Sequence, residues 1–451
     1  MLVDNALARY FDNVRLALRQ LLGERDGADG DFTPGIDLPD LTPAMLEYLS
    51  VSGIEHVRLP SYRGKNLALL DLTRNPATMT TKTFASLVIV ARAVRFIRDT
   101  GERVTIVTPS SGNKAIALRD AVLRAISCGL VSADQLNVVA VVPANSVPKL
   151  RVSELFSDPE LRKRNPIAVY HGDPPGRVKD ISRGLVDEHR TELERGLKTN
   201  FWYTLRLENY LAADIVRAFA EAEFFPASPD EPRLHAHAVS SAYGLLGHSY
   251  GRSMAPPESG GGASPDPRYF LVQHLGAPDM VLSLYHQGST DPSHLPQYTY
   301  DLESGLYGQD ENPRFPAVTF EPSEALDPTF YTRGPATSPR MDEIIHEQGG
   351  GGIVVSMAEC LNRYPRIRAL LGAANIRLPA QPVALREWSL VMAFTGVLNA
   401  IDRGLIAEND VLVHGSGSYS VADYAPLTDR DLHPVEDVES LRQVLCETLA
   451  S

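Results

Sequence analysis

Residues 104–143 read VTIVTPSSGNKAIALRDAVLRAISCGLVSADQLNVVAVVP, and this stretch decides the fold. Residues 104–108 are an apolar-rich run that predicts a buried strand, and residues 137–143 predict a second one. Between them, residues 114–129 have the spacing of a helix that ends at Gly129. A strand, a helix of about 15 residues and another strand form a βαβ unit with parallel strands. Parallel strands are covered by helices on both faces, which explains why these two runs are continuously apolar.

The same alternation extends in both directions along the chain. Further strands are predicted at 66–72, 167–172, 234–240 and 410–414, and further helices at 83–98, 205–224, 357–371 and 387–404. The stretch 285–345 is rich in Pro, Tyr and Asp with weak periodicity, which predicts an irregular insert. A length of 451 residues predicts two or three domains. The fold class expected from these patterns is α/β with parallel sheets.

Composition excludes several classes of protein. The net charge is −13, so we expect no nucleic-acid binding, because such a surface repels phosphate backbones. No apolar run approaches the roughly 20 residues that cross a bilayer, so we expect no membrane segment. Cys128, Cys360 and Cys446 are too few and too scattered for a disulfide framework or a cysteine-rich zinc site. These features predict a protein of the reducing cytoplasm.

Four loops follow predicted strands and share small hydroxyl residues, Gly and Asn. They are TRNPATMTTKT (73–83), TPSSGNKA (108–115), VSSAYGLLG (239–247) and VHGSGSYS (413–420). Ligands of open α/β sheets bind beyond the carboxyl ends of strands, and such loops offer N–H groups and hydroxyls to an anion. None has the Walker or the complete dinucleotide-binding pattern, which disfavours those nucleotide-binding classes. His235 and His237 share one face of a strand, but without a third ligand nearby we expect packing rather than a metal site.

Lys82 lies among threonines, directly before an apolar helix. An ordinary surface lysine is one interpretation. The alternative is a functional amine, because the positive end of the helix dipole lowers the pKa of an amine and favours imine formation with an aldehyde cofactor.

The ordered set of loops resembles the threonine synthase family of fold-type II pyridoxal 5′-phosphate (PLP) enzymes. NPATMTTK (75–82) is similar to its lysine loop, VTIVTPSSGN (104–113) to its Ser-Gly-Asn strand end, and TSPRMDEI (337–344) to its Ser-Pro-x-Met-Asp segment. The resemblance covers roughly residues 30–425. It implies a fold like that of the tryptophan synthase β-subunit, with two parallel-sheet domains. The implied large cofactor domain is 1–99 with 200–451, including an N-terminal subdomain (1–75) and the insert, and the small mobile domain is 100–199.

The resemblance also implies site residues. Lys82 would form the Schiff base with PLP, and Asn113 would bind the ring oxygen. The cofactor phosphate would bind to Ser240, Ser241, Ala242, Tyr243 and Gly244, and the pyridine nitrogen would face His414, with Ser416 two residues further on. A substrate carboxylate would bind to Ser110, Ser111 and Gly112. Cations for a substrate anion would be Lys114, Lys149 and Arg151. No metal is implied.

The implied activity is a lyase-type elimination or replacement on a small amino-acid substrate, in a monomer or homodimer. Thr81 replaces an aromatic residue before the lysine, Thr83 replaces an acid after it, and Lys114 replaces a small hydroxyl residue. These departures touch substrate and cofactor contacts. They predict a substrate other than phosphohomoserine, in specialised amino-acid metabolism. The alternative is a catalytically silent relative that binds a ligand or a partner.

Overall fold

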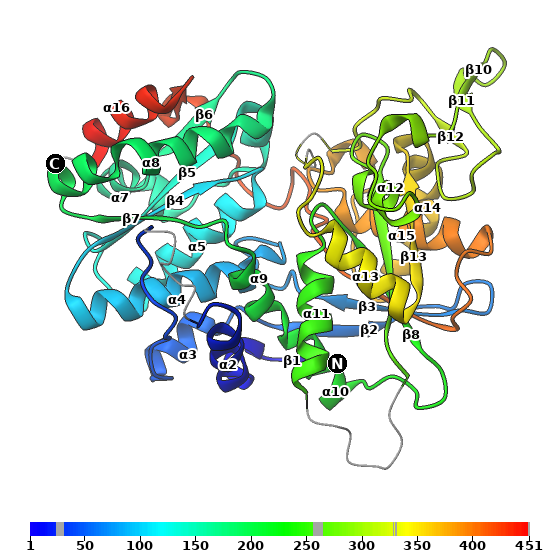
Figure 1. Cartoon of the computed structure of the whole chain (residues 1–451), viewed down its shortest axis with the longest axis horizontal. Helices are drawn as coiled ribbons and strands as arrows, with labels where there is room; N and C mark the ends of the chain where they lie inside the picture. Colours follow the sequence, from blue (N-terminus) through cyan, green and yellow to red (C-terminus); the bar gives the residue numbers. More distant parts are fainter. Residues whose placement is uncertain (24–30, 256–264, 328, 330–331, 450–451) are drawn as a thin grey trace. The chain divides into compact units, whose positions relative to one another are not determined.

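The protein is described by a computed structural model, which covers residues 1–23, 31–255, 265–327, 329 and 332–449. Its chain divides into two compact units, drawn in Figure 1. The first unit comprises residues 1–3, 54–74 and 217–420, and the second comprises 4–53, 75–216 and 421–451. The predicted α/β class, with parallel sheets and helices on both faces, is confirmed.

The sheet of the first unit has seven strands in the order β1-β2-β3-β14-β8-β9-β13. The last five of these run parallel, whereas β1 and β2 pair antiparallel at one edge. The strands are β1 (Leu2–Val3), β2 (Ile54–Arg58), β3 (Asn66–Asp71), β8 (Arg233–Ala238), β9 (Arg268–His274), β13 (Gly350–Val355) and β14 (Asp410–His414). Because β3, β14 and β8 are parallel and in register, Leu70, His414 and His237 end side by side.

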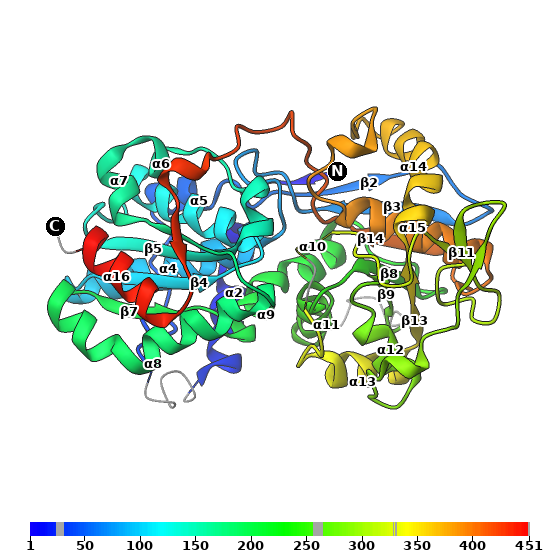
Figure 2. The ribbon, with the colours of Figure 1, turned by 90° about the horizontal axis from the view of Figure 1, so that it is seen from above.

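Helices cover both faces of this sheet, as Figure 2 shows. The almost entirely buried α15 packs on β8, β9 and β13, with α14 on its outer side, while α12 and α13 pack on β9 and β13. Burial of this largely apolar helix against parallel strands contributes to the hydrophobic core of this unit. The helices are α10 (Val216–Phe224), α11 (Tyr243–Met254), α12 (Asp279–Tyr285), α13 (Ser338–Gln348), α14 (Met357–Gly372) and α15 (Ser389–Asp402).

The second unit contains a five-stranded, entirely parallel sheet in the order β15-β6-β5-β4-β7. The strands are β4 (Val104–Pro109), β5 (Leu136–Pro143), β6 (Ile167–Tyr170), β7 (Asn200–Tyr203) and β15 (His433–Val435). Helices α8 and α16 share a hydrophobic core with this sheet, and α5 contributes to a separate core with β5 and β6. The helices are α1 (Ala6–Arg9), α2 (Phe11–Leu21), α3 (Pro43–Leu49), α4 (Lys82–Thr100), α5 (Asn113–Ser127), α6 (Glu154–Ser157), α7 (Pro159–Arg164), α8 (Val178–Leu197), α9 (Leu207–Asp214) and α16 (Val438–Leu449).

The unit boundaries differ from the domain boundaries expected from sequence. Residues 4–53, 75–99, 200–216 and 421–451 belong with 100–199 rather than with the larger expected domain. Packing explains the difference, because α4 lies against α5 and α9, and α16 lies against α8. The chain also returns to this unit at its end, where β15 pairs with β6.

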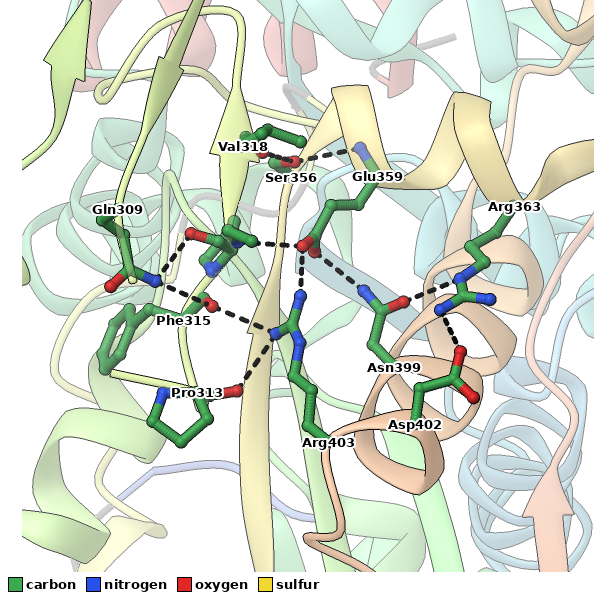
Figure 3. Close-up of polar contacts among 12 residues, drawn as sticks. Gln309, Pro313, Phe315, Val318, Ser356, Glu359, Arg363, Asn399, Asp402 and Arg403 are labelled. Carbon is green, nitrogen blue, oxygen red and sulfur yellow. Dashed lines mark hydrogen bonds and ion pairs between the residues drawn. The ribbon is translucent and has the colours of Figure 1, made fainter. Parts of the chain in front are cut away.

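The predicted irregular insert, 285–345, contains regular structure. Strands β10 (Thr299–Asp301), β11 (Leu306–Gly308) and β12 (Val318–Thr319) form a small antiparallel sheet, and α13 begins within the insert. Figure 3 shows the polar network that fixes this segment to α14 and α15. Glu359 accepts hydrogen bonds from the Ala317 N–H at 3.0 Å and from Asn399 Nδ2 at 2.9 Å, and it pairs with Arg403. Arg403 donates to the carbonyl of Phe315 at 3.1 Å.

Among the described helices, none combines the length and the apolar character that crossing a membrane requires.

Candidate functional site

Lys82 is the first residue of α4 and is half-buried. The turn before it is fixed by hydroxyl groups: Thr78 Oγ1 and Thr83 Oγ1 lie 2.6 Å apart, and Thr83 Oγ1 donates to the carbonyl of Thr80 at 2.9 Å. Met79 in this turn has a φ of 48°, a left-handed conformation that a side chain disfavours. The threonine hydroxyls therefore hold the turn that leads into the amine-bearing residue.

A second amine shares the surroundings of Lys82. Lys82 Nζ lies 5.4 Å from the ring centroid of Tyr210 on α9, and Lys114 Nζ lies 5.8 Å from the same ring. Lys114 is only 8% exposed and donates to the carbonyl of Thr204. Burial, and then the charge of Lys82, holds the pKa of Lys114 well below its usual value. Lys114, predicted from sequence as a cation for a substrate anion, therefore loses its proton more readily than an ordinary lysine.

The Ser110–Asn113 turn lies between β4 and α5. Ser110 Oγ accepts the N–H groups of Gly112 at 3.1 Å and Ala115 at 2.8 Å, which shapes the turn. Gly112 has a φ of 112°, and a Cβ atom there would lie 3.4 Å from Lys149 Cδ. The structure thus brings together the predicted residues Ser110, Gly112 and Lys149, and Asn113 begins α5 beside them.

Arg151 takes a different position. Its Nη1 donates to the carbonyl of Ala77 at 3.2 Å, and its guanidinium lies 4.6 Å from the ring centroid of Tyr424. Arg151 therefore supports the base of the Lys82 loop.

In the first unit, the predicted phosphate turn joins β8 to α11. Ala242 has a φ of 51° and precedes Tyr243, the first residue of α11. A Cβ atom on Gly244 would lie 2.9 Å from His237 Cε1 and 3.0 Å from Arg217 Nη2, so only glycine fits. A buried guanidinium directly beneath a helix N-terminus is a favourable environment for an anion.

A second helix start meets this turn. Thr337 Oγ1, at the start of α13, donates to the carbonyl of Ser241 at 2.8 Å. The next residue, Ser338, is 5% exposed, and its hydroxyl has no hydrogen-bond partner among the described residues. Because a buried hydroxyl without a partner is unfavourable, this atom suits a ligand oxygen. The turn, Arg217 and Ser338 together fit a phosphate group.

A buried polar chain runs behind the turn. Arg217 can only donate, so its Nη1 contact to His414 Nδ1 (3.1 Å) makes Nδ1 an acceptor and places the imidazole proton on Nε2. His414 Nε2 then donates to His235 Nδ1 at 2.9 Å, and His235 Nε2 faces Glu221 Oε1 at 3.6 Å. Burial, and then neighbouring charges, holds the pKa of His414 well below its usual value, and burial does the same for His235. Both rings are therefore neutral.

This chain changes the role expected for His414. The sequence predicted that it faces a pyridine nitrogen, yet Arg217 and His235 engage both of its ring nitrogens. These contacts leave neither ring nitrogen of His414 available to a pyridine nitrogen. Ser416 lies two residues further on and is half-buried. Its hydroxyl is the remaining candidate in this loop for the partner of the pyridine nitrogen.

Glu221, His235 and His248 offer three ligand atoms within 4.8 Å of one another, a group that includes His235 but not His237. The distances nevertheless indicate hydrogen bonds. Glu221 Oε2 lies 2.6 Å from His248 Nε2, and Glu221 Oε1 lies 2.7 Å from Arg233 Nη1. Two ligands of one tetrahedral zinc ion would be roughly 3.3 Å apart. Arg233 already neutralises the carboxylate, so this cluster is a buried hydrogen-bonded network.

Sequence reasoning missed Tyr210, Arg217, Glu221 and Ser338. Arg217 and Glu221 are charged residues in the run IVRAFAEAEF (215–224), which is the second half of the predicted helix at 205–224. Both are almost completely buried in the structure. Tyr210 carries no sequence signal of its own, because its role depends on the meeting of α9 with α4.

Comparisons with solved structures agree with this fold. Threonine synthase from Escherichia coli matches with a TM-score of 0.53 and 14% identity, covering 96% of this chain and 96% of that one. Yeast threonine synthase matches with a TM-score of 0.57 and 10% identity (99% and 89% covered). PLP-bound threonine synthase from Brucella melitensis matches with a TM-score of 0.55 and 11% identity (97% and 89% covered). The chain therefore has the fold of the fold-type II class, as the sequence predicted.

Within that class, the chain belongs to the family described as "Family of unknown function (DUF6002)", whose profile matches residues 2–449. No curated protein matches the sequence.

Proposed function

We propose that this protein is a PLP-dependent enzyme that carries out elimination or replacement on an amino acid, with a substrate other than phosphohomoserine. The observation that carries the proposal is the placement of Lys82, whose amine lies at a rigid helix start beside Tyr210 and Lys114. The fold supports it, since similar structures include a PLP-bound threonine synthase.

Each unit, considered by itself, carries residues that fit one part of the cofactor. In the second unit, Lys82 would hold it covalently and Asn113 would donate to the ring oxygen. In the first unit, the turn Ser240–Gly244, with Arg217 beneath it and Ser338 beside it, would hold the phosphate. Ser416 would offer a neutral hydroxyl to the pyridine nitrogen. Bound PLP supplies an electron sink for carbanion chemistry.

The Ser110–Gly112 turn and Lys149 would bind the substrate, and Lys114 would move protons. N–H groups of the Ser110–Ser111–Gly112 turn, at the start of the 15-residue α5, would bind the substrate carboxylate. Lys149, which lies against Gly112, would add a positive charge. Burial, and then the charge of Lys82, lowers the pKa of Lys114, which makes its Nζ a candidate proton acceptor.

The direct test is titration of the purified protein with PLP. We expect a visible absorbance band in the wild type and in Lys163→Ala, which removes an exposed lysine of α7 in the same unit. Lys82→Ala should lack the band. The holoprotein should then change its spectrum with an amino acid that carries a leaving group at Cβ or Cγ. A band that persists in Lys82→Ala would refute the assignment of the amine.

A second candidate is a catalytically silent ligand- or partner-binding protein. It is favoured by the departures of the lysine loop and by His414, whose ring nitrogens are occupied within the protein. The same titration separates the two proposals, because a silent protein gains no visible absorbance with PLP.

A further inference from the structure

The second unit contains a pocket that none of the proposed functions uses. Its volume is about 200 Å³. Its walls come from the start of the Lys82 loop (Pro76–Ala77), one side of α5 (116–120), residues 150–153 and residues 424–427. Its lining includes neither Lys82 nor the Ser110–Asn113 turn.

The pocket walls are held by backbone pairing. The N–H of Val152 donates to the carbonyl of Ala425 at 2.9 Å, and the N–H of Leu427 donates to that of Leu150 at 3.1 Å. The inner surface is apolar, since Ile116, Leu150 and Ile167 are each at most 6% exposed and all line it. One wall of the pocket is therefore apolar.

Charges of both signs line the same pocket. Arg151 is 8% exposed and lies over the ring of Tyr424 at 4.6 Å. Asp120 accepts a hydrogen bond from Asn75 Nδ2 at 2.8 Å. Burial raises the pKa of Asp120, whereas the Asn75 bond and nearby arginines, Arg151 among them, oppose that rise. Arg119 is directed at the backbone carbonyls of Asn165 (2.5 Å) and Leu155 (3.2 Å) and serves the fold.

We propose that this pocket binds a free α-amino acid, with its carboxylate on Arg151, its ammonium group on Asp120 and its side chain against the apolar wall of Ile116, Leu150 and Ile167. The guanidinium of Arg151 and the carboxylate of Asp120 both line the pocket, and they match the two charges of a zwitterion. The available volume suits a small ligand. The site is separate from the proposed catalytic residues and does not depend on PLP.

Two side chains that line the pocket also form hydrogen bonds with the lysine loop. Asp120 binds the side chain of Asn75, and Arg151 binds the carbonyl of Ala77, so both proposed ligand contacts also hold the segment that leads to Lys82. A ligand that engages these two groups changes the contacts available to residues 75–82. A ligand shifts the equilibrium between two conformations only if it binds one of them more tightly than the other. Here the difference in affinity arises because Asp120 and Arg151 contact both the ligand and residues 75–77. The pocket is thus an effector site for the lysine loop.

Isothermal titration calorimetry of the PLP-free full-length protein against the free L-amino acids tests this proposal. We expect at least one to bind, with acetate at least tenfold weaker because it lacks the ammonium group. Arg151→Met and the near-isosteric Asp120→Asn should each raise Kd at least tenfold, since hydrogen bonds to charged groups are worth this much. Arg103→Gln, a control at an exposed arginine of the same unit, should leave Kd unchanged.

Lys82→Ala separates this proposal from the catalytic one. It should leave Kd unchanged, and ligand should alter hydrogen exchange in residues 75–82 of the wild type. Absence of binding by every amino acid would overturn the proposal. Binding that is lost in Lys82→Ala and retained in Asp120→Asn would also overturn it, by placing the ligand at the proposed catalytic site. If Arg151→Met fails to fold, Asp120→Asn alone decides the outcome.

Discussion

The neutral His414–His235 chain makes the first unit sensitive to acid. In the folded protein both pKa values lie well below the usual value, mainly because of burial. In the unfolded chain these histidines titrate near pH 6.5. Below that pH the unfolded state binds protons that the folded state does not, so stability falls as pH falls. Between pH 7 and pH 5 each histidine should reduce the free energy of unfolding by about 2 kcal/mol.

His414→Gln removes one of these two groups. Its stability at pH 7 should fall by about 1 to 3 kcal/mol, because buried hydrogen-bond partners lose their contacts. Its additional loss between pH 7 and pH 5 should be about 2 kcal/mol smaller than that of the wild type, since one proton-binding group is gone from the unfolded state. The substitution therefore lowers stability at pH 7 but reduces the further loss of stability between pH 7 and pH 5. Measurements at several pH values separate these two effects.

Urea unfolding at several pH values measures this difference. The chain has two tryptophans, Trp202 in the second unit and Trp388 in the first. A Trp202→Phe background therefore makes fluorescence report the first unit, which matters because a two-unit chain need not unfold in one step. His346→Gln, an exposed position on α13, is the matched control and should keep the full acid sensitivity. If the free energy of unfolding of His414→Gln fell between pH 7 and pH 5 by as much as that of the wild type, the neutral state of the buried histidines would be refuted.

Three further substitutions probe other parts of the structure. Gly244→Ala should weaken PLP binding at least tenfold in a spectral titration, because the new methyl group meets His237. Glu359→Ala should destabilise the first unit by about 3 to 5 kcal/mol in urea unfolding, because it leaves Arg403 without its buried partner, and hydrogen exchange of residues 309–318 should increase. Lys114→Gln should lower kcat at least tenfold and remove from the pH–rate profile the limb due to its depressed pKa; an unchanged profile would exclude it as a proton carrier.

Much of the fold could be predicted from local patterns. The strands predicted at 104–108, 137–143 and 410–414 are found as β4, β5 and β14 to within a residue or two at each end. These strands are buried on both faces and bounded by turn residues, so their sequence signal is strong. The predicted helix at 205–224 is interrupted at Ile215 and forms α9 and α10.

Other elements gave little signal. The 20-residue α8 is strongly polar and follows Asp-Pro-Pro-Gly, which indicates a loop. The edge strand β15 has only three residues. The unit boundaries were also hidden, because the chain crosses between the units several times and only packing shows which segments belong together.

The candidate site also combines residues that the sequence indicates with features that only the tertiary structure shows. Lys82, Ser110 and Gly112 stand out because hydroxyl and glycine residues cluster after strands, a feature of short stretches of sequence. Lys114 was recognised as a charge, but its burial and its proximity to Lys82 depend on three helices. The occupied nitrogens of His414 depend on Arg217, almost 200 residues away in sequence. Residue types can be read locally, whereas protonation states require the tertiary surroundings.

The central claim is that the amine of Lys82 holds PLP. Its most direct measurement is reduction of the PLP-loaded protein with borohydride, followed by proteolysis and mass spectrometry. We predict one stoichiometric cofactor adduct, located on Lys82. An adduct on Lys114 or on surface lysines, or no adduct after full exposure to PLP, would contradict the proposed function.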